Sequence, residues 1–319
     1  MRIIAILDTG YKTYDYEKTL FEKHGYALRL YTGDPNDTAA KREFAREAVG
    51  FLIRGTDVDG EFFDACPNLK AVVRYGVGYD NVNVHEATAR GIRVANVQGY
   101  GNHSVSAHAL ALMLACVRGL PLGIRQIHSH FSAPPFEDMF ELHDKTLGII
   151  GLGRIGSQVA RKAGGLFRRV VAVDPYKPEE HFDRVNAVRV NLETVLAESH
   201  VLTLHCNLNE ETRHLISDRA FALMKKRPVL INTARGPVVD ERALAAALEA
   251  NRIHSAGLDV FETEPPGPEQ ESLLQHPRVI ATGHYAWYSD AASLTLQRRA
   301  ADNMVALLNG ETIKDCLNP

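Results

Sequence analysis

Three polar side chains each follow a short apolar run in the second half of the chain. Arg235 follows the run at 229–231, Glu264 the run at 255–258 and His284 the run at 279–281. If these runs are strands of one parallel sheet, their carboxyl ends lie at one edge, which is where ligands bind in such sheets. The spacing therefore predicts that an arginine, a glutamate and a histidine meet in one site.

These residue types suit the reduction of a 2-keto acid. Arg235 can fork onto the substrate carboxylate and polarise the neighbouring carbonyl. His284 can give a proton to the carbonyl oxygen while a hydride arrives from a nicotinamide, and it can take the proton back in the reverse direction. Glu264 would hold the other ring nitrogen of the histidine and stabilise the imidazolium. Any one of these residues alone is typical of a surface loop, whereas the three together indicate a site.

A glycine-rich turn provides the expected place for the cofactor. The segment 151–156 reads Gly-Leu-Gly-Arg-Ile-Gly, follows the apolar run 146–150 and precedes a helical stretch at 157–167. Asp174 stands 18 positions after the last glycine, at the end of the next apolar run. This context is the dinucleotide-binding fingerprint, in which the glycines allow a tight turn and a close approach of the pyrophosphate, and the acid bonds the ribose hydroxyls. Because such an acid repels a 2′-phosphate, the sequence predicts NAD in preference to NADP.

Short apolar runs alternate with helical stretches over most of the chain, which predicts an α/β fold with parallel sheets. Strands are expected at 3–7, 27–30, 49–53, 71–74, 92–94, 146–150, 170–173, 201–204, 229–231, 255–258 and 279–281. Helices are expected at 14–24, 104–117, 157–167 and 291–308, and the proline- and histidine-rich stretch 127–144 is interpreted as a loop. The apolar helix at 104–117 is too short to cross a bilayer.

The composition excludes several classes of protein. With 319 residues, of which 45% are hydrophobic and 24% charged, the chain has the size of two globular domains. The 36 basic and 39 acidic residues give a net charge of −3, so neither nucleic acid nor a membrane surface is an expected partner. The four cysteines lie far apart and fit a reducing compartment, so we expect the cytoplasm. His128 and His130 have no third ligand at a recognisable spacing, so no metal site is expected.

Four features of the sequence resemble the D-isomer-specific 2-hydroxyacid dehydrogenase family. They are the glycine motif with Asp174, and the stretches 74–81 (RYGVGYDN), 232–241 (NTARGPVVDE) and 258–265 (LDVFETEP). Within that family, 204–209 (LHCNLN) and 284–289 (HYAWYS) are most similar to the C-terminal binding protein branch and its bacterial dehydrogenase relatives. The resemblance implies an NAD-dependent oxidoreductase that interconverts a D-2-hydroxy acid and its 2-keto acid, with His284 as general acid and base. Two alternatives stay open: an NADH-sensing, corepressor-like binding protein, and a phosphoglycerate- or glyoxylate-type dehydrogenase of the same family.

The resemblance also implies a role for each residue that matches a family motif. The catalytic positions are Arg235, Glu264 and His284. The substrate-binding positions are Arg74, Gly76, Val77, Gly78 and Trp287. The cofactor-binding positions are Gly151, Gly153, Arg154, Ile155, Gly156, Asp174, Cys206, Asn207, Thr212, Thr233, Ala234 and Asp259. Within this last set, Asp259 is expected to bond the nicotinamide carboxamide, and Cys206 to be a packing residue beside the adenosine.

The family fold implies two Rossmann-like or flavodoxin-like parallel-sheet domains with a cleft between them. The substrate domain is expected to be discontinuous, with residues 1–99 and 290–319, and the NAD-binding Rossmann domain is expected to span 100–289. The helix at 104–117 would begin the second domain and help to form a homodimer. His103 and His108, near its start, could touch substrate but are more simply interpreted as packed or solvated.

Three positions depart from the family pattern. Gln98, Asn207 and Gly283 each replace a common proline. Gly283 directly precedes His284, so it frees the backbone just where the catalytic histidine has to be aimed. These departures leave the substrate and the rigidity of the loops open, but they remove no catalytic group.

Overall fold

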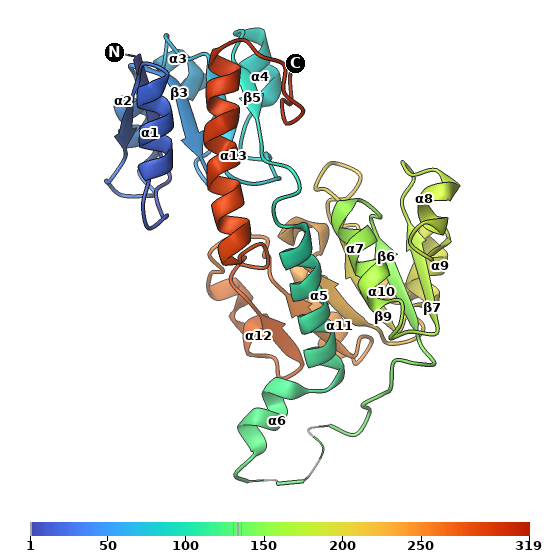
Figure 1. Ribbon diagram of the computed structural model, residues 1–319. Helices are drawn as coiled ribbons and strands as arrows, with labels where there is room; N and C mark the ends of the chain where they lie inside the picture. Colours follow the sequence, from blue (N-terminus) through green and yellow to red (C-terminus); the bar gives the residue numbers. More distant parts are fainter. Residues whose placement is uncertain (1, 130, 133, 135) are drawn as a thin grey trace. The chain divides into compact units, whose positions relative to one another are not determined.

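The chain folds into two α/β units, which are seen in the computed structural model (Figure 1). The structure describes residues 2–129, 131–132, 134 and 136–319. One unit consists of Met1–Tyr100 with Ser289–Pro319, and the other of Gly101–Tyr288. Each unit contains one parallel sheet, five-stranded in the first and seven-stranded in the second. This confirms the predicted fold class, while the assignment of one unit to substrate and the other to cofactor stays a prediction.

The sheet of the first unit has the strand order β2-β1-β3-β4-β5. Its strands are β1 Arg2–Ile6, β2 Tyr26–Leu30, β3 Ala48–Ile53, β4 Ala71–Arg74 and β5 Arg93–Ala95. Its helices are α1 Asp15–Lys23, α2 Thr38–Ala45, α3 Gly60–Ala65, α4 Val84–Ala89 and α13 Asp290–Leu308. The central strand β3 is buried at every position, because helices pack on both faces of the sheet.

The last helix, α13, returns the chain to the first unit. It packs beside α1 and against β3 and β4 (Figure 1). It begins after Ser289, whose hydroxyl accepts a hydrogen bond from the backbone N–H of Ala292 at 3.1 Å, as expected for an N-cap. Gly50 of β3 lets α13 approach closely, since a β-carbon there would lie 2.5 Å from Sδ of Met304.

The sheet of the second unit has the strand order β12-β11-β10-β9-β6-β7-β8. Its strands are β6 Thr146–Ile150, β7 Arg169–Val173, β8 Val188–Arg189, β9 Val201–Leu204, β10 Val229–Asn232, β11 Ser255–Leu258 and β12 Val279–Ala281. Its helices are α5 Asn102–Val117, α6 Leu120–Gln126, α7 Arg154–Ala163, α8 Glu179–Asp183, α9 Leu192–Glu198, α10 Asp218–Leu223, α11 Glu241–Glu249 and α12 Glu271–Gln275. Two apolar clusters cover the two faces, one built with α5 and α7 and the other with α9, α10 and α11.

Two helices of the second unit differ from the expectation. The helix after the glycine motif, α7, spans Arg154–Ala163 and not 157–167, because Gly156 lies inside its first turns and Gly164 caps its end. A helix that was not expected, α6, follows Gly119. Its Pro121 lies in the first turn, where a proline starts a helix instead of breaking it.

No single helix of the described residues is both long enough and apolar enough to cross a membrane. The helices α5 and α6 reach that length and composition only when they are taken together, and they are bent by 53° where they meet. Within the second unit, α5 packs its buried residues against α7, β10 and β11, as a core helix does.

Candidate active site and cofactor site

Glu264 and His284, which follow β11 and β12, form a direct pair in the second unit. Nδ1 of His284 lies 2.5 Å from Oε2 of Glu264. The other carboxylate oxygen, Oε1, accepts a hydrogen bond from the backbone N–H of Phe261 at 3.0 Å. Because Nδ1 faces the glutamate, the second ring nitrogen, Nε2, is the one left to exchange a proton with a substrate.

The charge of Glu264 is stabilised by its surroundings. Burial raises the pKa of this carboxyl, but the hydrogen bond and charge of His284, the Phe261 amide and the charge of Arg235 together outweigh burial and lower it below 4.5. The glutamate is therefore an anion at neutral pH. It can hold the imidazole ring in one orientation and stabilise its protonated form.

Arg235 follows β10 on a backbone that is fixed from both sides. Asn232, the last residue of the strand, donates a hydrogen bond from Nδ2 to the carbonyl of Arg235 at 2.9 Å and accepts one from the N–H of Ala234 at 3.0 Å. The guanidinium donates from Nη1 to the carbonyl of Ala234 at 2.8 Å. Because β10, β11 and β12 are neighbouring parallel strands, the residues Arg235, Glu264 and His284 that follow them lie at one edge of the sheet.

The backbone of His284 is held in an uncommon conformation by Asp259. The φ angle of His284 is +54°, in the left-handed region that residues other than glycine rarely adopt. The carboxylate of Asp259 accepts hydrogen bonds from the N–H groups of Tyr285 at 3.1 Å and Ala286 at 2.9 Å, and from Oγ1 of Thr282 at 2.6 Å. The carbonyl of Asp259 also accepts from the N–H of His284 at 2.7 Å. Asp259 is 1% exposed, and its carboxylate accepts hydrogen bonds from this loop. Its expected hydrogen bond to a nicotinamide carboxamide stays a prediction.

The glycine motif lies where the strand order of the second sheet reverses, between β6 and β9. Such a switch point is where dinucleotides bind in this kind of sheet. Gly151 has a φ of +89°, and a β-carbon there would lie 2.5 Å from the backbone nitrogen of Cys206, which follows β9. Gly153 has no heavy atom within 4 Å of its β-carbon position and directly precedes α7. The turn therefore combines a tight bend with an open approach to a helix N-terminus, as the pyrophosphate of a dinucleotide requires.

Asp174 lies at the end of β7 beside this turn. It is 9% exposed, and its Oδ2 accepts a hydrogen bond from the N–H of Leu152, inside the glycine motif, at 2.8 Å. Its Oδ1 accepts from the N–H of Tyr176 at 3.0 Å. Each oxygen keeps a further lone pair, so the carboxylate can still accept from ribose hydroxyls.

The loop after β9 carries the other predicted adenosine contacts. Thr212 donates from Oγ1 to the carbonyl of Asn207 at 2.7 Å, which closes this loop on itself. Burial raises the pKa of the Cys206 thiol to about 11, so this cysteine is a packing residue and not a nucleophile.

An unsatisfied hydroxyl marks the expected nicotinamide end. Among the described residues, Oγ1 of Thr233 is buried and has no hydrogen-bond partner. A buried polar atom without a partner is costly, so it indicates a group that the bound state supplies. Together with the glycine turn and Asp174, Thr233 and Ala234 fit a bound dinucleotide.

The predicted substrate loop, Gly76–Val77–Gly78, belongs to the first unit. The carbonyl of Gly76 accepts from the N–H of Val97 at 2.9 Å, and the carbonyl of Val77 accepts from Nδ2 of Asn96 at 2.6 Å. Gly76 has a φ of +142°, and a β-carbon there would overlap the guanidinium of Arg74. These two hydrogen bonds fix the carbonyls of Gly76 and Val77.

Trp287 and the catalytic trio belong to the second unit, whereas Arg74 and the glycine loop belong to the first. The ring of Trp287 packs edge-on against Tyr288, with centroids 5.6 Å apart. Its contact with substrate stays a prediction.

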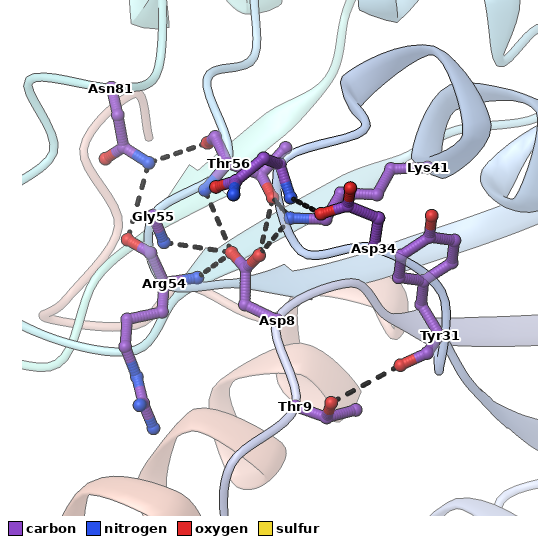
Figure 2. A network of polar contacts seen from close by, with 10 residues as sticks. Asp8, Thr9, Tyr31, Asp34, Lys41, Arg54, Gly55, Thr56 and Asn81 are labelled. Carbon is purple, nitrogen blue, oxygen red and sulfur yellow. Dashed lines mark hydrogen bonds and ion pairs between the residues drawn. The ribbon is translucent and has the colours of Figure 1, made fainter.

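A carboxylate hub in the first unit was missed in the sequence (Figure 2). Oδ2 of Asp8 accepts hydrogen bonds from the N–H groups of Arg54, Gly55 and Thr56, at 2.6, 2.9 and 2.9 Å. Oδ1 accepts from Oγ1 of Thr56 and from Nζ of Lys41, both at 2.6 Å. Burial raises the pKa of Asp8, but these donors outweigh it and lower the pKa to about 2. The signal available in the sequence was an acid just after the first strand, at the edge where polar groups gather.

A histidine that supports the glycine turn was also missed. Nε2 of His181, in α8, lies 2.9 Å from the carbonyl of Leu152 and 2.9 Å from Oγ of Ser157. Nothing in the local sequence distinguishes His181 from a surface residue. His130, the second member of the histidine pair, lies outside the described residues, and among the residues that are described no three potential ligands gather as a metal would require.

Comparison with known proteins identifies the family. Residues 110–286 match the model of the D-isomer specific 2-hydroxyacid dehydrogenase, NAD binding domain. The chain is 37% identical to the glyoxylate reductase of Korarchaeum cryptofilum, over 82% of this chain and 80% of that protein. It is also 34% identical to the D-3-phosphoglycerate dehydrogenase of Archaeoglobus fulgidus, over 100% of this chain but only 59% of that protein. The chain thus spans little more than half the length of this phosphoglycerate dehydrogenase.

A solved structure supports the same conclusion. The D-lactate dehydrogenase of Aquifex aeolicus, complexed with NAD and lactic acid, superposes with a TM-score of 0.89 at 26% identity, covering 100% of this chain and 99% of that one. The chain belongs to the D-isomer specific 2-hydroxyacid dehydrogenase family, and it carries that family's NAD-binding domain. The family and the cofactor predicted from the sequence are confirmed.

Proposed function

We propose that the protein interconverts a D-2-hydroxy acid and its 2-keto acid, with NAD as the redox partner. The observation that carries this proposal is the pair of His284 and Glu264, 2.5 Å apart at the edge of the NAD-binding domain and within the electrostatic reach of Arg235. A histidine oriented by a carboxylate beside an arginine is suited to move a proton at a carbonyl oxygen whose neighbour is a carboxylate.

Each residue of the chain has a separate task in this proposal. Arg235 binds the substrate carboxylate, and His284 donates a proton from Nε2 to the carbonyl oxygen in the reducing direction and removes it in the oxidising direction. Glu264 orients the ring and stabilises the imidazolium. NAD, when bound, supplies or accepts the hydride. The residues that hold NAD are the glycine motif 151–156, Asp174, Thr233 and Ala234, with the 206–212 loop at its adenosine end.

Five further residues are proposed to contact the substrate. The amides of Gly76, Val77 and Gly78 bind the substrate carboxylate, and Arg74 and Trp287 contact the rest of the molecule. Relatives named as glyoxylate reductase, glyoxylate/hydroxypyruvate reductase B and D-3-phosphoglycerate dehydrogenase support a small, polar 2-keto acid.

The test is a turnover assay with purified protein and NADH. Glyoxylate, hydroxypyruvate, pyruvate and phosphohydroxypyruvate are supplied in turn while the absorbance of NADH is followed, and NADPH serves as the cofactor control. We expect oxidation of NADH with at least one acid, and a loss of about 10²–10⁴-fold in the His284→Ala variant. His128→Ala, at an exposed histidine, is the matched control and should retain activity. Tight NADH binding without turnover of any acid would contradict the proposal.

We also propose that the protein acts as a homodimer. Leu120, Ile124 and Ile127 lie on α6 or directly after it and are exposed, as is Leu114 on α5. Exposed apolar residues in such a group are typical of a contact surface. Light scattering should give a dimer mass for the wild type and a monomer mass for Ile124→Glu; a monomeric wild type would refute the assignment.

The cytoplasm is the compartment we propose. All four cysteines are free, two of them buried and two partly buried, which suits a reducing environment. Fractionation of cells that express the tagged full chain would test this assignment.

A further inference from the structure

A histidine of α5 lies against the loop that carries His284. Nε2 of His108 lies 3.0 Å from Oγ1 of Thr282, two positions before the catalytic histidine. The ring of His108 also packs edge-on against the ring of Tyr285, one position after it, with centroids 5.2 Å apart. His108 therefore contacts the residues on either side of His284 in the sequence.

The direction of the hydrogen bonds follows from the single proton of the Thr282 hydroxyl. Oγ1 of Thr282 lies 2.6 Å from Oδ1 of Asp259, and a carboxylate can only accept. The hydroxyl therefore donates to Asp259, and it must accept from His108. This places a proton on Nε2 of His108. The result is a chain of hydrogen bonds from His108 through Thr282 to Asp259.

The chain ends on the group that holds the catalytic loop. Asp259 is almost fully buried, and it accepts from the N–H groups of Tyr285 and Ala286 as well as from Thr282. Nε2 of His108 lies 3.6 Å from Oδ1 of Asp259, so the two groups also face each other directly. If the chain is broken at Thr282, the carboxylate loses its shortest donor and the His108 proton loses its acceptor.

The loop needs such support because of its own sequence. Gly283 has no side chain and, next to His284 with its φ of +54°, leaves the backbone free to relax. Apart from its chain neighbours, no heavy atom lies within 4 Å of a β-carbon position at Gly283, so the position is open around a side chain. The hydrogen bonds to Asp259 from Thr282, Tyr285 and Ala286, with that of the His284 N–H, hold the backbone that carries the histidine.

We propose that His108 is a positioning residue that aims His284 through Thr282 and Asp259. It does not exchange a proton with substrate; Glu264 already occupies Nδ1 of His284, and His108 acts only on the backbone that carries the ring. This inference rests on the proposed function, because aiming His284 matters only if His284 transfers the proton.

The test compares two pairs of variants. Thr282→Val removes the hydroxyl at constant shape, and Thr282→Ser keeps it; His108→Leu removes the donor, and His108→Gln offers an amide N–H in its place. We expect kcat for the best keto acid to fall about tenfold to a hundredfold in Thr282→Val and His108→Leu, because a small displacement of a catalytic group has effects of this size. The Kd for NADH, measured by fluorescence, should stay within about twofold, and Thr282→Ser and His108→Gln should recover most of kcat.

The double variant Thr282→Val/His108→Leu sharpens the result. Because both changes break one chain, the double variant should lose no more than the worse single variant. Equal kcat values for Thr282→Val and Thr282→Ser, or additive losses in the double variant, would overturn the proposal. If Thr282→Val fails to fold, as thermal unfolding would reveal, the His108→Leu and His108→Gln pair decides alone.

A measurement without turnover separates this inference from the proposed function. In histidine-labelled protein, the Cε1–H signal of His284, assigned with His284→Ala, should shift or split in Thr282→Val and stay in place in Thr282→Ser. If the signal changes in this way but the protein turns over no keto acid, the hydrogen-bonded series from His108 to Asp259 is supported and the catalytic assignment is rejected. An unchanged signal in Thr282→Val would overturn the inference whatever the activity.

Discussion

One carboxylate in each unit, the half-buried Asp8 and the buried Asp259, holds a loop at the carboxyl ends of a parallel sheet, and the two differ in what balances their charge. Asp8 follows β1 and accepts from three successive amides of the loop after β3, while Asp259 follows β11 and accepts from two amides of the loop after β12. Asp8 is also paired with Lys41, whose side chain is 3% exposed. Both carboxylates accept a hydroxyl hydrogen bond, Asp8 from Thr56 and Asp259 from Thr282, and the imidazole of His108 lies 3.6 Å from Asp259.

This difference indicates that Asp8 acts mainly on the stability of the fold and Asp259 mainly on the catalytic loop. A carboxylate with a buried lysine and four further hydrogen bonds fixes its loop rigidly and keeps its pKa near 2 (Figure 2). The carboxylate of Asp259 accepts from amides and a hydroxyl, which carry no full charge, so its negative potential stays available to the histidine loop that it holds. We therefore expect changes at Asp8 to act on the free energy of unfolding and changes at Asp259 to act on turnover.

The largest expected effect is the loss of stability in Asp8→Asn. The substitution leaves the buried ammonium of Lys41 without its anion, which should lower the free energy of unfolding by about 3–4 kcal/mol. Under conditions where the variant remains folded, kcat should change by less than about threefold. Urea unfolding followed by circular dichroism measures the first quantity, with the exposed Asp57→Asn as the matched control. A stable Asp8→Asn with reduced kcat would reverse the roles of the two carboxylates.

Asp259→Asn should show the opposite pattern. An amide in place of the carboxylate cannot accept all three hydrogen bonds in the same way, so the loop shifts and kcat/KM for the keto acid should fall about a hundredfold. The loss of stability should be smaller than in Asp8→Asn, about 1–3 kcal/mol. Steady-state kinetics and urea unfolding on the same samples check both values. Full activity in this variant would show that the loop with His284 keeps its conformation without the Asp259 carboxylate.

The dependence of stability on pH should reveal Asp8 in the wild type. Because its pKa is lowered from 3.8 to about 2, the ionised group stabilises the fold fully above about pH 4, and this contribution is lost as the pH falls toward 2. The lost contribution should amount to about 2 kcal/mol. Unfolding in urea at a series of pH values should show this slope in the wild type and a flatter curve in Asp8→Asn. Parallel curves for the two proteins would contradict the ionisation assigned to Asp8.

The smallest effect is expected at Asn81, which supports the same loop from its carbonyl side. Nδ2 of Asn81 donates to the carbonyl of Thr56 at 2.7 Å and to that of Arg54 at 3.4 Å. Asn81→Ala should lower the free energy of unfolding by about 1 kcal/mol, the usual contribution of such a bond. A loss of stability as large as that of Asp8→Asn would mean that the hydrogen bonds of Asn81 to the loop carbonyls, and not those of Asp8 to the loop amides, hold this loop.

The sequence predicted the sheets well because buried parallel strands are short apolar runs with clear ends. The runs 146–150, 201–204 and 255–258 coincide with β6, β9 and β11. The short strand β8 and the helix α6 escaped prediction for physical reasons. The two residues of β8 carry no apolar run, and Pro121 near the start of α6 resembles a helix breaker until its position in the first turn is known.

The candidate catalytic residues could be proposed from the sequence, whereas the residues that hold them could not. Arg235, Glu264 and His284 can be recognised in the sequence by their residue types and by their positions after strands. His108 is separated from Thr282 by 174 positions in the chain, and no local pattern links them. The role of Asp259 could not be predicted either, since only the folded loop shows from which amides its carboxylate accepts hydrogen bonds.

The central claim, proton transfer by His284 coupled to hydride transfer from NADH, is tested most directly by isotope transfer. The protein is given NADH that carries deuterium on the transferable C4 position and the keto acid of the panel that gives a chiral product at the highest rate. We predict a D-configured 2-hydroxy acid with one deuterium at C2, and no detectable product in the same time with His284→Ala. A product of L configuration, a product without deuterium at C2, or an equal yield from His284→Ala would contradict the account.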